Sequence, residues 1–200
     1  ESVMYNISNV VIQVLVNALG TDTVAAWTTV GKIDAFYWMV INAFEISITT
    51  FVGQNYGAGK YQRMRKSVKV CMGIALASAI VVSGLLLLLR TPVFGLFTTD
   101  SGVISIGTGM LRFLLPSYPI YVIIGILSGA MRGTGNVLVP MALTCGGVCL
   151  LRIVWLFAAT PLYPGMNTIM ASYPISWSIT AVFFILYYFK KFPGRTPRKR

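Results

Sequence analysis

The most restrictive feature of this sequence is a series of long apolar segments. In residues 75–89, for example, only Ser78 and Ser83 have polar side chains. A run of about 20 apolar residues matches a hydrocarbon core roughly 30 Å thick. Only 10% of all residues are charged, whereas a water-soluble domain usually has about 25%. We therefore expect an all-α membrane protein surrounded by membrane lipid.

Turns rich in glycine or proline separate the apolar segments. The segments between them predict a bundle of six transmembrane helices, at residues 2–19, 23–53, 67–89, 103–131, 137–159 and 168–189. A short amphipathic connector is expected at 93–102. In this interpretation residues 1–189 form one six-helix lobe, and residues 190–200 form a basic tail.

Basic residues cluster at two predicted turns and at the C-terminal end. They are Lys60, Arg63, Arg65, Lys66 and Lys69 in the first turn, Arg132 in the second, and the tail KKFPGRTPRKR. Short loops rich in Lys and Arg stay on the cytoplasmic side of a membrane. Counting crossings from the first turn predicts that both chain ends are cytoplasmic. We expect the membrane to be the plasma membrane. Because the net charge of +11 lies mainly at membrane boundaries, no nucleic acid partner is expected.

The chemistry of metal centres and enzymes is not expected from this sequence. It contains no histidine, and its three cysteines lie in apolar segments. The predicted helix that carries Cys145 and Cys149 has no carboxylate. These cysteines are interpreted as packing residues, so neither a metal site nor a bound cofactor is predicted. A Ser–His pair or two close carboxylates would be needed for a membrane enzyme, and neither is evident.

The first predicted helix carries a row of carboxamide side chains. Asn6, Asn9, Gln13 and Asn17 follow a 3-4-4 spacing, which brings them to one face of a helix. Carboxamides facing lipid would lose their hydrogen bonds to water. We expect this face to line a hydrated cavity that binds substrate or cation. Hydrogen bonding between helices is the alternative.

The second predicted helix carries a polar row that includes two carboxylates. Asp34, Trp38, Asn42, Glu45 and Thr49 are spaced 4-4-3-4. Asp34 and Glu45 are eleven residues apart, or roughly 16 Å along the axis, too far for a carboxylate dyad. Intramembrane carboxylates usually mark functional sites, so we interpret the two as stations along one path. The alternative for each is a structural ion pair, and for Glu45 also contact with cytoplasmic water.

The fourth predicted helix is interrupted by proline. Pro116 and Pro119 lie within one turn and should bend or break the helix. A broken helix at mid-depth often marks the binding site of a transporter. Tyr121 flanks the break and is a candidate for substrate contact.

The fifth predicted helix contains a deep cation, Arg152. Its expected depth resembles that of Asp34, so a buried, charge-assisted ion pair between the two is predicted. Such a pair would form or break as the lobe changes shape, or it would simply hold two helices together.

Three segments of the chain resemble a known family. They are GTDTVAAWTTVGKID at 20–34, SITTFVGQNYGAGKYQRMRKS at 47–67 and SGAMRGTGNVLVP at 128–140. They resemble the seventh and eighth helices of MATE (multidrug and toxic compound extrusion) transporters with the following loop, and the junction of the tenth and eleventh helices. The GQN-x-GAG and RG-x-G-x-x-x-x-P blocks occur in order and at the appropriate spacing.

The resemblance implies that the chain is the C-terminal half of a twelve-helix antiporter. Two six-helix lobes would alternate between inward- and outward-open states and export organic cations or other drugs in exchange for Na⁺ or H⁺. The partner implied is the N-terminal six-helix lobe, and the chain, which begins without Met, is expected to be a fragment of a longer protein.

The sequence departs from the family pattern at the expected cation site. Some members use an acidic residue in the tenth helix, but the corresponding region, 118–128, has none, and Tyr121 falls about where it would lie. Glu1 is out of step with the glutamate that such members carry in the seventh helix. A Na⁺ site of that type is not expected, which leaves Asp34, Glu45 or a carboxylate of the other lobe for ion coupling.

Two other functions remain open from the sequence. A lipid-linked saccharide flippase of related architecture would need a strongly cationic cavity, and only Arg152 and Arg112 are expected to lie deep. A lobe that pairs with another chain without transporting anything is the other alternative.

Overall fold

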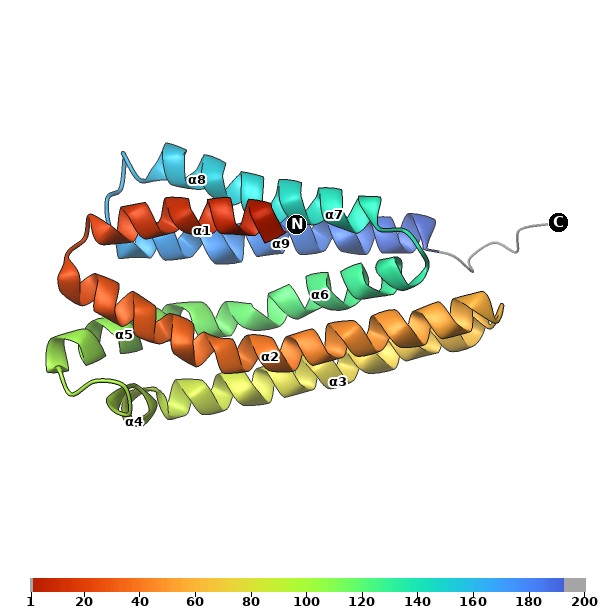
Figure 1. The fold of residues 1–200 in the computed structure, drawn as a ribbon, viewed down its shortest axis with the longest axis horizontal. Helices are drawn as coiled ribbons and strands as arrows, with labels where there is room; N and C mark the ends of the chain where they lie inside the picture. Colours follow the sequence, from red (N-terminus) through yellow and green to blue (C-terminus); the bar gives the residue numbers. More distant parts are fainter. Residues whose placement is uncertain (1, 193–200) are drawn as a thin grey trace.

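The computed structural model describes residues 2–192, and within that range all regular secondary structure is helical (Figure 1). The helices are α1 (Ser2–Asn17), α2 (Thr21–Gly57), α3 (Tyr61–Leu88), α4 (Arg90–Gly95), α5 (Ser101–Leu114), α6 (Tyr118–Gly133), α7 (Leu138–Thr144), α8 (Leu151–Ala159) and α9 (Met166–Lys191). A 3-10 turn, Leu115–Ser117, joins α5 to α6, and a π-helical segment, Cys145–Leu150, joins α7 to α8. Residues 193–200 of the predicted tail lie outside the described residues.

The bundle confirms the predicted all-α membrane fold, with one crossing shorter than expected. Among the described residues, five helical stretches are long and apolar enough to cross a membrane: Thr21–Gly57, Tyr61–Leu88, Ser101–Gly133, Leu138–Ala159 and Met166–Lys191. The apolar α1 has 16 residues, a length of about 24 Å. Its last helical residue is Asn17, two positions before the predicted end at Leu19.

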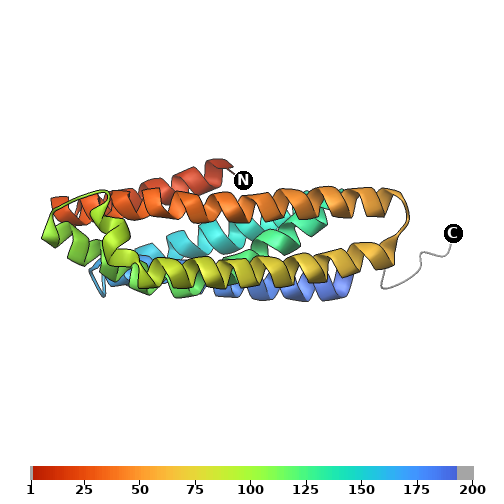
Figure 2. The same ribbon diagram turned by 90° about the horizontal axis from the view of Figure 1, so that it is seen from below.

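Helices α2 and α3 form a long antiparallel hairpin that extends beyond the predicted boundaries (Figures 1 and 2). The sequence predicted ends at Gly53 and a restart at Ser67, whereas α2 continues to Gly57 and α3 begins at Tyr61. Lys, Arg and Gln favour helix, so the basic run belongs to the first turns of α3 and not to a loop. Gly59, with φ of 69°, makes the tight turn possible.

The turns of the bundle gather at its two ends. The α2–α3 turn, the α6–α7 turn and the last residue of α9 lie at one end, on the right in Figure 1. The α1–α2 turn and α4, which begins at Arg90, lie at the other end. The basic residues of α3 and Arg132 therefore share one end of the molecule.

The predicted break at the two prolines is present. Helix α5 ends at Leu114, and α6 starts at Tyr118 with Pro119 in its first turn, where no backbone donor is required. The Ser117 hydroxyl donates to the carbonyl oxygen of Leu114 at 2.6 Å. The break thus keeps one of its carbonyls hydrogen-bonded.

A second interruption was not predicted. The helix expected to run unbroken over 137–159 widens into the π-helical segment at Cys145–Leu150. A Cβ atom on Gly147 would collide with the Thr180 hydroxyl of α9. The close approach of α9 therefore requires glycine here, and Cys149 is buried beside it as a packing residue.

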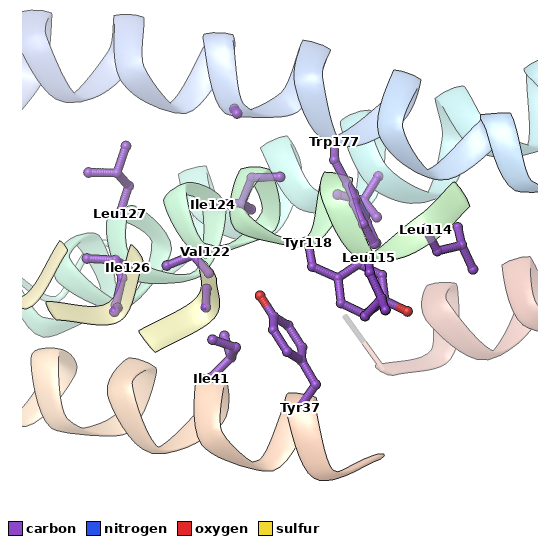
Figure 3. Close-up of a cluster of buried hydrophobic side chains, with 14 of the residues drawn as sticks. Tyr37, Ile41, Leu114, Leu115, Tyr118, Val122, Ile124, Ile126, Leu127 and Trp177 are labelled. Atoms are coloured by element: carbon purple, nitrogen blue, oxygen red, sulfur yellow. The ribbon is translucent and has the colours of Figure 1, made fainter. Parts of the chain in front are cut away.

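Helix α6 lies at the centre of the bundle and packs on α2, α3 and α9. Figure 3 shows its aromatic contacts with α2 and α9. The ring centroids of Tyr118 and Tyr37 of α2 are 4.8 Å apart, and those of Tyr118 and Trp177 of α9 are 5.8 Å apart. By contrast, α3 exposes several large apolar side chains, among them Ile74, Ile80 and Leu85, as expected for a helix with one face toward lipid.

Three glycines on one face of α6 bring it against α2. A Cβ atom on Gly125 would collide with the Glu45 side chain. On Gly129 it would lie 2.9 Å from the Glu45 carbonyl oxygen, and on Gly133 2.6 Å from the Thr49 carbonyl oxygen. Small residues four positions apart allow backbones in a membrane to approach closely. The α2–α6 contact therefore depends on the missing side chains.

A matched pair of glycine substitutions tests this contact. Gly129→Ala should lower the unfolding midpoint of the intact protein in detergent by about 5 °C, because overpacking costs about 1–3 kcal/mol. Gly73→Ala, in the middle of α3, meets open space and should leave the midpoint unchanged or slightly raised. Equal midpoints for the two variants would contradict the interpretation of the contact.

Candidate functional site

A cavity of about 520 Å³ lies between α1, α2, α6, α8 and α9. Small-molecule sites are roughly 300–1,000 Å³ in volume. The polar lining consists of Asn9, Gln13, Asp34, Asn42, Glu45 and Arg152, and the aromatic lining of Tyr5, Trp27, Trp38, Tyr118, Tyr121, Tyr173 and Trp177. The cavity therefore combines a volume suited to small molecules with charged, amide and aromatic groups.

Members of both polar rows face this cavity. Asn9 and Gln13 reach it from α1, and the row from Asp34 to Glu45 reaches it from α2. The Gln13 amide also donates to the Asn17 side chain at 2.8 Å, a contact along one helix and not between helices. The binding role of these residues stays a prediction.

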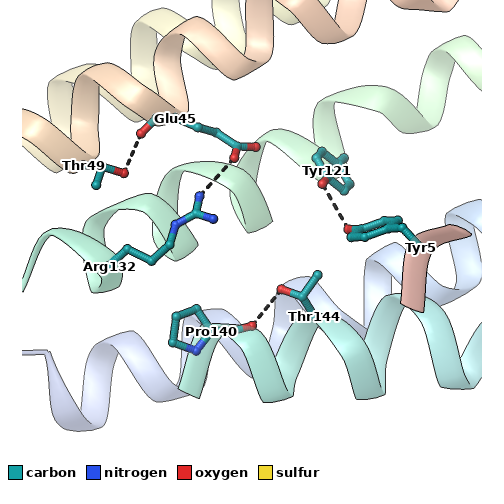
Figure 4. A network of polar contacts seen from close by, with 7 residues as sticks. All are labelled: Tyr5, Glu45, Thr49, Tyr121, Arg132, Pro140 and Thr144. Carbon is teal, nitrogen blue, oxygen red and sulfur yellow. Dashed lines mark hydrogen bonds and ion pairs between the residues drawn. The ribbon is translucent and has the colours of Figure 1, made fainter. Parts of the chain in front are cut away.

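Asn6 and Asn17 are the exceptions in the carboxamide row. Both are exposed, and neither lines the cavity. Next to Asn6, Tyr5 takes the inward position, and its hydroxyl lies 3.1 Å from that of Tyr121 (Figure 4). Tyr121 lines the cavity beside the proline break, as the sequence predicted.

Asp34 has one engaged and one free carboxylate oxygen. The Tyr118 hydroxyl donates to Oδ2 at 2.5 Å. The other oxygen, Oδ1, is buried and has no hydrogen-bond partner among the described residues. A buried acceptor without a partner is costly. Asp34 therefore offers an unmet acceptor to a proton, a cation or a donor that enters the cavity.

The predicted ion pair between Arg152 and Asp34 is wrong. Arg152 is 3% exposed, and its guanidinium carbon lies 3.9 Å from the centroid of the Tyr173 ring. No ion pair links Arg152 to a carboxylate in the described part of the chain. The reason is that aromatic residues intervene: Tyr118 engages Asp34, while the face of Tyr173 holds the cation.

Glu45 is engaged in an ion pair, which was the alternative for this residue. Its Oε2 lies 3.2 Å from Nη2 of Arg132, which reaches back from the last turn of α6 (Figure 4). The side chains are 15% and 31% exposed, respectively. The two carboxylates of α2 therefore differ: the charge of Glu45 is balanced by Arg132, whereas Asp34 forms no ion pair among residues 2–192.

An aromatic cluster surrounds Asp34 and extends beyond what the sequence analysis identified. The ring centroids of Trp38 and Tyr121 are 4.8 Å apart, and those of Tyr121 and Trp177 are 5.4 Å apart. Trp177 and Tyr173 come from α9 and were not singled out from the sequence. Their four-residue spacing is the signal that could have identified them, because it brings both rings to one helix face. Aromatic faces of this kind attract organic cations.

The family model for MatE matches residues 1–157 of the sequence. The chain belongs to the MatE family. The probable multidrug resistance protein NorM of Chromobacterium violaceum is 33% identical over 132 residues, which is 65% of this chain and 28% of that protein. The chain spans about a third or less of the length of the first curated relatives it matches, whose covered shares are 28%, 32% and 31%.

Solved structures show the same fold as this MatE-family chain. A transporter of the MOP superfamily from Pyrococcus furiosus superimposes with a TM-score of 0.86 at 17% identity, over 95% of this chain and 42% of that one. The MATE transporter VcmN of Vibrio cholerae, in its bent form, gives 0.83 at 19% identity, over 94% and 43%. The chain thus has the architecture of part of a larger multi-pass membrane protein. Family membership also confirms that it is not an enzyme.

A double-mutant cycle tests the Glu45–Arg132 contact. Glu45→Gln and Arg132→Gln should each lower the unfolding free energy, and the double variant should lose less than the sum because the interaction is already absent. We expect a coupling of about 1 kcal/mol, since the pair is only partly buried.

The control cycle combines Glu45→Gln with Lys60→Gln, an exposed residue without an ion pair in the described chain. This second cycle should be additive. Coupling of the same size in both cycles would show that general charge, and not the contact, is responsible.

Proposed function

We propose that the chain is one lobe of a cation-coupled multidrug efflux antiporter of the plasma membrane. The observation that carries the proposal is Asp34, a carboxylate with one unpartnered buried oxygen in an aromatic cavity. Its substrate is an organic cation or another drug-like molecule, and its coupling ion is H⁺ or Na⁺. A second, N-terminal six-helix lobe completes the transporter.

The relatives support export of drugs as the activity. Matching proteins include a multidrug resistance protein of Pseudomonas aeruginosa and the human multidrug and toxin extrusion protein 1. The cavity beside the polar row of α2 suits this activity, because a few polar groups among aromatic and aliphatic side chains can orient varied ligands.

The proposed exchange follows from competition for Asp34. An organic cation binds with its charge near the free oxygen and its apolar body on the rings of Trp38 and Tyr121. A proton or Na⁺ at the same carboxylate removes the charge that attracted the drug. Transport follows if each ligand prefers a different arrangement of the two lobes, since coupling is a difference in affinity between states.

The distribution of charge supports a cytoplasmic position for both chain ends. The basic residues of α3 and Arg132 share one end of the bundle, together with the end of α9. Short segments rich in Lys and Arg remain cytoplasmic. Lys32 lies in the first half of α2, and Arg90 begins α4 at the opposite end of the bundle. Long basic side chains at such positions can reach the outer membrane interface.

The charge of the cavity favours an antiporter over a saccharide flippase. The described lining holds two carboxylates, of which Glu45 is paired with Arg132, and one cation, Arg152, which stacks on Tyr173. A pyrophosphate-linked substrate would need a clear excess of cations, which this lining does not have. A purely structural lobe would have no need for a cavity of about 520 Å³ that brings charged, amide and aromatic groups together.

Substitution of Asp34 tests the proposed role of this carboxylate. Asp34→Asn retains an acceptor for the Tyr118 hydroxyl but removes the charge. In the intact transporter we expect cells to lose drug resistance and ethidium efflux, with expression and unfolding midpoint preserved. Wild-type efflux by this variant would remove Asp34 from the mechanism.

Asp100→Asn provides the matched control. Asp100 caps α5, and its Oδ1 accepts from the backbone amides of Gly102 and Val103 at 2.8 and 3.2 Å. Asn caps helices about as well as Asp. This variant makes the same charge change outside the cavity and should transport normally.

Imposed ion gradients identify the coupling ion. Ethidium uptake into inverted vesicles containing the intact protein should accelerate under one gradient, either of protons or of Na⁺, and the other should have no effect. The acceleration should disappear in Asp34→Asn. Uptake that responds to neither gradient would contradict coupled antiport.

A further inference from the structure

A second hollow lies on the surface between α2 and α3, near the turn that joins them. Its volume is about 460 Å³, and its walls are mainly apolar. Phe44 and Phe51 contribute from α2, and Val70 and Ile74 from α3. Phe51 and Ile74 are 43% and 53% exposed, so the hollow opens outward and is separate from the Asp34 cavity. We call it the α2–α3 groove.

One end of the α2–α3 groove is cationic. Arg63 and Lys66 line it from the first two turns of α3, and both are exposed. The hydroxyl groups in the lining are already used: Ser47 donates to the Ala43 carbonyl at 2.7 Å and Ser67 to the Met64 carbonyl at 2.6 Å. The guanidinium and ammonium groups are therefore the strong donors that the groove offers to a ligand.

The charge of these two residues is not balanced by an ion pair within the part of the chain that the structure describes. Neither Arg63 nor Lys66 forms an ion pair with a carboxylate between residues 2 and 192. The first turn of α3 contains no acidic residue. Cations at the start of a helix also oppose its dipole, whose positive end lies there. An anion at this end of the groove would relieve both effects.

We propose that the α2–α3 groove binds an anionic phospholipid. The phosphate contacts Arg63 and Lys66, and one acyl chain lies along Phe44, Phe51 and Ile74. Lys66 and Ile74 are eight residues apart, about 12 Å along α3. The groove can therefore accommodate the part of an acyl chain that is nearest to the headgroup. Basic pockets beside transmembrane helices on the cytoplasmic side attract anionic headgroups.

The cationic end and the apolar walls of the groove together favour an anionic phospholipid over other ligands. A free anion would use the two cations but leave the apolar walls uncovered. A neutral lipid would cover the walls, and a choline headgroup would add a positive charge beside Arg63 and Lys66. A lipid with net negative charge satisfies both ends of the groove.

Native mass spectrometry of the intact protein tests the proposal. Phosphatidylglycerol and phosphatidylcholine with identical acyl chains are titrated into the detergent-solubilised protein. The wild type should bind phosphatidylglycerol about tenfold more tightly. The double variant Arg63→Gln/Lys66→Gln should lose that preference. Equal binding of the two lipids by the wild type would overturn the proposal.

A charge-matched control separates the site from general attraction. Lys60→Gln/Lys69→Gln removes two exposed cations from the same part of the chain, and neither residue lines the groove. This variant should retain the preference for phosphatidylglycerol. If it loses the preference to the same extent as the groove variant, the attraction is diffuse and the site is refuted.

Two further measurements test the acyl-chain part of the site. Val70→Trp keeps both cations but fills the groove, and it should weaken phosphatidylglycerol binding about tenfold. Glycerol 1-phosphate, which has the headgroup without the chains, should not displace the lipid. Displacement by glycerol phosphate, or unchanged binding by a normally folded Val70→Trp, would reduce the site to anion binding alone and overturn the proposal.

Discussion

The structure depends on the close backbone contact between α2 and α6. Gly125, Gly129 and Gly133 leave room for the α2 backbone, so the polar row of α2 meets the broken helix directly. In a membrane, helices gain little from the hydrophobic effect against lipid, and close packing provides the attraction instead. The hydrogen bond between Tyr118 and Asp34 and the ion pair between Arg132 and Glu45 both cross this contact.

This contact gives two similar carboxylates different environments. Arg132 lies in the last turn of α6, directly before Gly133, and its charge balances that of Glu45. Asp34, nearer the other end of α2, meets only a tyrosine hydroxyl and retains one unpartnered oxygen. The same packing that stabilises the lobe thus leaves a carboxylate oxygen of Asp34 available beside aromatic rings that can cover the apolar part of a ligand.

Features with a simple period could be predicted from the sequence, and features that depend on partners could not. The spacing of Asn9 with Gln13 and of Asp34 with Asn42 predicts one shared face, and both pairs line the cavity. Depth alone suggested that Arg152 would meet Asp34. Depth does not predict the position of the Tyr173 ring, which belongs to α9 and lies against the guanidinium of Arg152. The start of α3 was misjudged because Lys and Arg were taken as loop residues although they favour helix.

The π-helical segment before α8 has a consequence for the orientation of everything that follows it. A widened turn of this kind accommodates an extra residue, and one residue corresponds to about 100° of rotation around a helix axis. Shortening residues 145–150 by one position would let the coil tighten to regular geometry and swing Arg152 off the face that now carries it inward. The π-helical segment therefore determines the direction in which Arg152 points, and Arg152 is the only cation among the described residues that line the Asp34 cavity.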